Sequence, residues 1–161
     1  MPPSLFNARL LKVTRVAQTI PSVGEKVALV IYAWFGDVTR FRGARELASY
    51  AGLVPSVRQS GKSETLGGIT RMGSPQLRSM LVQSGHMLLG RCRGEPGSLS
   101  APLKALALRI ETARARRKIA VVAAARHILR IAYYVMRDGT SYDPERLSQP
   151  RTESMEPQVG S

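Results

Sequence analysis

The chain has 161 residues, 43% of them hydrophobic, and its 24 Lys and Arg against 11 Asp and Glu give a formal charge of +13. This length supports one hydrophobic core, and the positive excess predicts a polyanionic partner, first nucleic acid and second an anionic membrane surface. A single cysteine excludes an intramolecular disulfide framework, two distant histidines give no zinc-binding spacing, and the N-terminus lacks the pattern of a secretory signal.

The first two predicted helices, over residues 5–19 and 25–35, form a helix-hairpin-helix pattern around the sequence IPSVG. Backbone N–H groups at such a turn and at the start of the second helix lack helical partners, so they can hold a phosphate. The pattern predicts a phosphate-binding hairpin at Ser22, Val23 and Gly24. An ordinary helix-helix turn in the core is the alternative.

A third helix is predicted over residues 44–50, with Gly52 as a left-handed cap after its end. Arg40, Arg42 and Arg45 surround its start. A solvated helix face explains these arginines, and so does contact with phosphates close to the hairpin.

Residues 57–72 have no sustained helical period and are punctuated by glycines. The segments VRQS and GGITR predict a small β-hairpin, and a glycine-rich loop is the alternative. Ser60 lies in this region. A serine there can form a turn by bonding its own backbone, or can offer its hydroxyl to a ligand held by the loop.

A fourth helix is predicted to begin with Ser74 as N-cap and Pro75 at the first helical position. The side chains that fall on one face are expected to pack on the first helices; they are Leu77, Leu81, Ser84 and Leu88. His86 lies in this helix and is expected to be a packed or hydrogen-bonded core residue, with a catalytic base as the less favoured alternative.

Two further helices, over residues 103–112 and 115–136, follow a Gly-, Pro- and Ser-rich connection. An apolar face is predicted on the last helix; its members are Val121, Ala124, Ala125, Ile128, Ala132 and Val135. Arg126 and Arg130 lie opposite, and Arg116, Arg117 and Lys118 crowd the beginning. Cations at a helix N-terminus cost up to about 1 kcal/mol each, so phosphates are the expected counterpart.

The predicted fold class is mainly α: a helix-hairpin-helix, then a Gly-rich loop or small β-hairpin, and a bundle of long helices. The predicted organisation has four parts. These are residues 1–90 with the hairpin and the serine loop, 91–102 as a flexible connection, 103–140 as basic C-terminal helices, and 141–161 as a disordered tail.

Several short segments follow one another in a characteristic order: IPSVG (20–24), GDVTRF (36–41), LASYAGLVPS (47–56), QSGK (59–62), GGITRMGSPQLR (67–78) and RDGTSYDP (137–144). In order and spacing they resemble the C-terminal domain of the DEDD transposases of the insertion-sequence 110 (116/902) family. The resemblance covers roughly residues 10–147. It implies DNA recombination by a prokaryotic, cytoplasmic and nucleoid-associated protein.

The resemblance further implies that Ser60 is a nucleophile for DNA strand cleavage, with Arg58 or Lys62 offsetting charge on the phosphate. The other cations expected at nucleic acid are Arg40, Arg42, Arg45, Arg71, Arg78, Arg116, Arg117, Lys118, Arg126 and Arg130. No metal ligands are expected in this chain. The resemblance implies that Mg²⁺ is held by an N-terminal RNase-H-like acidic domain. It also implies a homo-oligomer, in which Ser60 of one subunit would meet the acidic domain of another, and an element-encoded guide RNA.

The acidic domain is not found in this sequence, whose first sixty residues contain only Glu25, Asp37 and Glu46 as carboxylates. A truncated or split transposase, inactive alone, is therefore expected. The glycine and basic residues that commonly follow the serine motif are replaced by Ser63-Glu64-Thr65. A non-catalytic DNA- or RNA-binding helix-hairpin-helix module is the alternative function, and association of the last helix with a membrane surface is a third.

Overall fold

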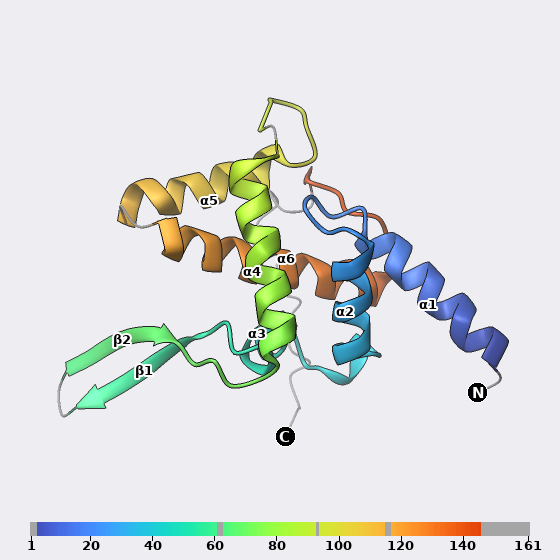
Figure 1. Ribbon diagram of the computed structural model, residues 1–161, viewed down its shortest axis with the longest axis horizontal. Helices are drawn as coiled ribbons and strands as arrows, with labels where there is room; N and C mark the ends of the chain where they lie inside the picture. The colour runs from blue at the N-terminus through green and yellow to red at the C-terminus, as the bar shows by residue number, and fades with distance from the viewer. Residues whose placement is uncertain (1–2, 61–62, 93, 115–116, 146–161) are drawn as a thin grey trace, which may run out of the picture.

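A computed structural model describes residues 3–60, 63–92, 94–114 and 117–145, and its fold is mainly α, as predicted (Figure 1). The elements are α1 (Pro3–Ala17), α2 (Glu25–Phe35), the 3-10 helix η1 (Val38–Arg40), α3 (Ala44–Tyr50), β1 (Pro55–Ser60), β2 (Ser63–Ile69), α4 (Pro75–Gly90), α5 (Ala101–Arg114) and α6 (Arg117–Asp138).

Helix α6 is the centre of the hydrophobic core. It packs against α1, α3, α4 and α5, which lie around it (Figure 1). All six residues of its predicted apolar face are buried, which confirms that prediction. By length and composition α6 could also cross a membrane, yet 61% of its apolar window is buried inside the protein. Its apolar face is therefore occupied by neighbouring helices, and the membrane-surface alternative loses the surface on which it depended.

The N-terminus of α4 follows the sequence signals closely. The Ser74 side chain accepts a hydrogen bond from the Leu77 N–H at 3.2 Å, and Pro75 is the first helical residue. All four residues of the predicted inward face are buried. The prediction for His86 is wrong: it is exposed, because it lies on the opposite side of α4 from Leu81 and Leu88.

Three predicted helices, those now labelled α1, α5 and α6, differ from the structure by two residues at each end. Helix α1 ends at Ala17 rather than residue 19, because the N–H groups of Thr19 and Ile20 bond to carbonyls three residues earlier and tighten the chain into turns. Helix α5 begins at Ala101, before the predicted start at 103, since Pro102 is tolerated in a first helical turn. Residues 91–100 connect α4 to α5, and their flexibility stays a prediction.

An antiparallel hairpin of β1 and β2, hereafter the serine arm, projects from the helical body (Figure 1). The predicted hairpin is confirmed, but its second strand begins earlier than GGITR. Ser60 pairs with Ser63, so the strand pairing extends to the last residue of β1 and the first residue of β2. The strands contact mainly each other, and no other helix or strand of the described chain packs extensively on them.

Two glycines fix the base of the serine arm. Gly52 and Gly73 have φ angles of +67° and +122°, which favour glycine. A Cβ on Gly52 would collide with the Met72 backbone, and a Cβ on Gly73 with the Tyr50 carbonyl. The chain entering the arm therefore crosses the chain leaving it at backbone contact, and the Arg71 N–H donates to the Gly52 carbonyl at 3.2 Å.

The described chain continues past α6, beyond the predicted start of the tail at residue 141. Tyr142 is buried, and its N–H donates to the Thr19 hydroxyl at 2.8 Å. Burial of this ring and its backbone hydrogen bond hold the chain after α6 to the body at Tyr142, whereas Ser141, Asp143 and Glu145 are exposed. The rest of the predicted tail, 146–161, lies outside the described residues.

Candidate nucleic-acid interface

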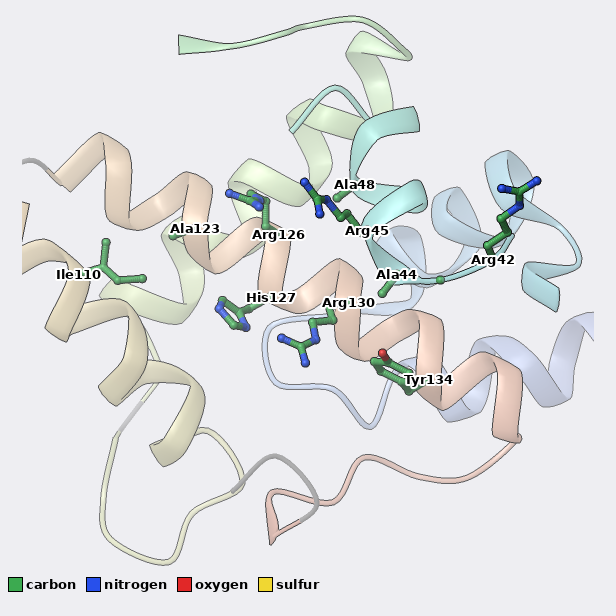
Figure 2. A pocket seen from close by; sticks show the side chains of 11 residues that line it. Arg42, Ala44, Arg45, Ala48, Ile110, Ala123, Arg126, His127, Arg130 and Tyr134 are labelled. Atoms are coloured by element: carbon green, nitrogen blue, oxygen red, sulfur yellow. The ribbon is translucent and has the colours of Figure 1, made fainter. Parts of the chain in front are cut away.

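A groove of about 600 Å³, hereafter the arginine groove, lies where α3 approaches α5 and α6 (Figure 2). Its charged side chains come from both sides: Arg42 and Arg45 from the α3 side and Arg126 and Arg130 from α6. Its remaining lining residues are Gly43, Ala44, Ala48, Ile110, Ala123, His127 and Tyr134. The groove thus joins residues about eighty positions apart in the sequence.

The helical period explains how α6 presents its share of the groove. Arg126 and Arg130 are four residues apart, so they lie one turn from each other on the side of α6 away from its buried face. On α3 the small side chains of Ala44 and Ala48 let the two helices approach. The Tyr133 hydroxyl donates to the Phe41 carbonyl at 3.1 Å and ties α6 to the segment just before α3.

The positive charge of the groove is not neutralised within the described protein. Salt bridges are formed by Arg9, Arg117 and Arg137, and none of the described carboxylates forms one with the four groove arginines. The nearby Glu46 carboxylate accepts a hydrogen bond from the Arg42 backbone N–H at 2.8 Å. In Figure 2 the Arg42 guanidinium points away from those of Arg45, Arg126 and Arg130, although Arg42 also lines the hollow. Guanidinium groups gathered at one hollow bind phosphate oxygens well.

His127 lies among these cations and is half-buried. Burial, followed by the charges of Arg130 and Arg126, lowers the pKa of the His127 imidazole below its ordinary value of 6.5. The ring is therefore neutral at neutral pH and can accept or donate a hydrogen bond in the groove.

Ser60 is the last residue of β1 and lies at the far end of the serine arm. Its backbone pairs with Ser63, and that of Arg58 with Thr65. Gly61 and Lys62, which complete the predicted serine motif, lie outside the described residues. Ser60 is thus held at the end of a hairpin that projects from the body (Figure 1).

The predicted phosphate-binding hairpin has an internally bonded turn. The Val23 side chain is buried and its N–H donates to the Ile20 carbonyl, so this amide serves the turn itself. Ser22 has a φ of +66°, the left-handed conformation for which glycine is better suited. The turn borders a separate hollow of about 830 Å³ beside α4. Phosphate binding at Ser22, Val23 and Gly24 stays a prediction.

The remaining predicted cations are spread along the chain. Arg40 and Arg71 are exposed, Arg78 is half-buried, and among the described groups its Nη1 atom has no hydrogen-bond partner. Arg117 pairs with Glu111 at 3.4 Å, and Lys118 is exposed. Both lie more than two turns along α6 from Arg126. Arg116 lies outside the described residues, as does the Arg58 side chain.

Two groove residues carry no separate signal in the sequence. His127 and Tyr134 would be found only by noting that they fall on the same side of α6 as Arg126 and Arg130. A metal site was not expected in this chain. Among the described residues no three His, Cys, Asp or Glu side chains gather as metal ligands would.

Comparison with known proteins gives a family match over residues 14–99, to the family described as Transposase IS116/IS110/IS902 family. The chain is 39% identical over 89 residues to the transposase for insertion sequence element IS1111A of Coxiella burnetii. It is 31% identical over 131 residues to the insertion element IS110 uncharacterized 43.6 kDa protein of Streptomyces coelicolor. It is also 32% identical over 127 residues to the pilin gene-inverting protein of Moraxella lacunata.

These matches cover 55%, 80% and 78% of this chain, respectively. They cover only 24%, 30% and 37% of the three relatives. The chain therefore corresponds to about a quarter to a third of the length of the relatives it resembles.

Proposed function

Because this chain belongs to the IS116/IS110/IS902 family of transposases, we propose that it binds DNA in the arginine groove and supplies Ser60 as the nucleophile for strand cleavage and transfer. The observation that carries this proposal is the groove itself, where four arginines without a carboxylate partner in the described chain surround one hollow. Phosphates that enter it replace water and counterions around the guanidinium groups, which favours binding.

The position of Ser60 supports its proposed chemistry. A hydroxyl at the tip of a projecting hairpin can approach a phosphodiester without a clash between the helical body and the duplex. In the proposed step the Ser60 Oγ–phosphorus bond forms while the bond from phosphorus to a deoxyribose oxygen breaks. The hydroxyl proton leaves Oγ and the departing oxygen gains a proton. The product is a serine–DNA phosphodiester, which a DNA hydroxyl can attack to rejoin the strand.

Further parts of the proposal concern the partners of Ser60. The family resemblance implies an acidic domain that holds Mg²⁺, which would favour loss of the serine proton and offset charge on the phosphate. A homo-oligomer would let the arm of one subunit reach that domain on another. An element-encoded guide RNA is a further polyanion that the basic surface would accommodate, and a cytoplasmic location fits all of these partners.

Replacing Ser60 with alanine tests the nucleophile. We expect Ser60→Ala to bind duplex DNA nearly as tightly as the unchanged chain, because the arginine groove is intact. It should form no covalent adduct on labelled DNA when the acidic domain of a family member is supplied with Mg²⁺. Denaturing gel electrophoresis of the labelled DNA measures the adduct.

Ser63→Ala is the matched control, since Ser63 faces Ser60 across the turn. This variant should retain the adduct. An adduct on the Ser60→Ala protein would show that another residue is the nucleophile.

A second candidate function is a nucleic-acid-binding module without catalysis, which the arginine groove favours because it contains no part of the serine arm. Both functions predict salt-dependent binding to duplex DNA. They differ in the covalent adduct, whose absence from the unchanged chain under conditions that activate a full-length relative would favour the binding module.

A further inference from the structure

Tyr50 is an exposed aromatic side chain that the protein holds in a fixed orientation. It is the last residue of α3 and is 45% exposed. Its ring centroid lies 5.8 Å from that of Phe35 at an interplanar angle of 56°, and 5.9 Å from that of Phe41 at 68°. Phe35 and Phe41 are themselves buried. The tyrosine ring is therefore supported from the core side while part of its surface meets solvent.

Two arginines belong to the parts of the chain that adjoin Tyr50. The Arg40 guanidinium carbon lies 4.8 Å from the Phe41 ring centroid, so Arg40 and Tyr50 both adjoin Phe41. Arg40 is held in place because its Nη2 atom also donates to the Trp34 carbonyl at 3.4 Å. Gly73 contacts the Tyr50 carbonyl, which brings the segment with the exposed Arg71 to the same end of α3.

An exposed aromatic ring beside arginines suits a ligand with both a flat apolar surface and a negative charge. A nucleotide in a single strand has these properties, since its base stacks on aromatic rings and its phosphate pairs with cations. A base inside a duplex is not available, because its two faces are covered by its neighbours. A second copy of this chain suits the surface less well, because each copy carries a net charge of +13.

We propose that Tyr50 is a stacking site for an unpaired base, with Arg40 binding a phosphate of the same strand. This inference rests on the proposed function and adds the form of the substrate. Tyr50 is five residues before the start of β1, so the unpaired nucleotide lies at the base of the serine arm. The strand bound at Tyr50 is therefore locally separated from its complement.

Fluorescence of 2-aminopurine, a base analogue quenched by stacking, tests this site. The probes are a single-stranded DNA oligonucleotide with one 2-aminopurine and a fully paired duplex of the same sequence. We expect the chain to quench the single-stranded probe, and Tyr50→Leu to lose the quenching and weaken single-strand affinity by about fivefold to a hundredfold. Duplex affinity should stay unchanged in this variant, because the arginine groove is not altered.

Tyr50→Phe and Trp34→Leu are the controls. Phenylalanine keeps the stacking ring and should retain quenching. Trp34 is the other aromatic side chain, among those described, that is more than a third exposed. Quenching that survives in Tyr50→Leu, or that is lost in Trp34→Leu instead, overturns the proposal.

Photocrosslinking of the unchanged chain tests the same site even if the Tyr50→Leu variant does not fold. A single-stranded oligonucleotide with 5-iodouracil should crosslink at Tyr50, mapped by mass spectrometry, and crosslinks confined to other residues overturn the stacking site. If the unchanged chain quenched the single-stranded probe but did not bind the duplex, this result would instead contradict the arginine groove. A chain that binds neither probe contradicts both proposals.

Discussion

His127 links the arginine groove to the stability of the fold. Its imidazole is half-buried beside Arg126 and Arg130, and both burial and these charges disfavour the protonated ring in the folded state. In the unfolded chain the ring is solvated and has its ordinary pKa. Below pH 6.5 the unfolded state therefore binds more protons than the folded state, and the difference favours unfolding.

The contribution of His127 to the free energy of unfolding should accordingly be fully present above pH 6.5. The free energy of unfolding should fall as the pH drops below that value. Urea denaturation at a series of pH values between about 5 and 8 measures this trend. His127→Gln, which cannot take up the proton, should flatten the curve over the same range. A curve of the same slope in both proteins would assign the pH dependence to other groups.

At the scale of whole elements, the crossing of α4 and α6 depends on Gly85. This residue is buried inside α4, and a Cβ there would lie 2.6 Å from the Val121 carbonyl oxygen of α6. The two helix backbones thus meet with no side chain between them. Since α6 is the centre of the core, the closeness of this crossing determines how the other helices pack around it.

Gly85→Ala should therefore destabilise the fold, although alanine has the better helix propensity. Pushing two packed helices apart typically costs about 1–3 kcal/mol, so we expect a lower melting temperature in calorimetry. Gly90→Ala is the matched control at the end of the same helix. Its Cβ would have only the Arg117 Nη2 atom nearby, at 3.9 Å, so this variant should be neutral or slightly stabilised. Equal melting temperatures for the two variants would contradict the close crossing.

Helix α3 serves two surfaces with one short segment. Ala44, Arg45 and Ala48 line the arginine groove, while Tyr50 at its end supports the proposed stacking site. The same end leads into the serine arm. The arginine groove and the proposed stacking site are thus connected by the seven residues of this helix.

For the whole molecule, the groove arginines should account for a measurable part of the salt dependence of DNA binding. We expect the double variant Arg126→Gln, Arg130→Gln to bind duplex DNA more weakly at low salt. The slope of log affinity against log salt should decrease by about 1 for each lost phosphate contact. Fluorescence anisotropy over a range of salt concentrations measures both changes.

The control is a second double variant, Arg9→Gln with Arg137→Gln, which removes the same charge. Both residues form salt bridges, with Asp37 at 3.0 Å and with Asp138 at 2.7 Å, so they are less available to phosphates. Its slope should change less. Equal slopes for the two double variants would show that net charge alone, and not the arginine groove, determines the binding.

The elements of this fold were largely predictable from the sequence, and the arginine groove was not. Pro75, the Ser74 cap and the apolar period of α6 are local signals, so they could be interpreted without knowledge of the fold. The groove depends on how α3 packs against α6, about eighty residues later, and no local pattern contains that contact. The role of these arginines in binding nucleic acid therefore stays a prediction, and their grouping around one hollow required the structure.

The serine arm has a consequence for how its reach can change. Because β1 and β2 contact mainly each other, lengthening both strands by matched residues leaves the helical core intact. Each added residue per strand extends the tip by about 3.3 Å. The length of the arm thus sets the distance from the helical core to Ser60. Variants with longer or shorter arms would place Ser60 at different distances from the core, and so at different positions on a bound partner, without changing the core itself.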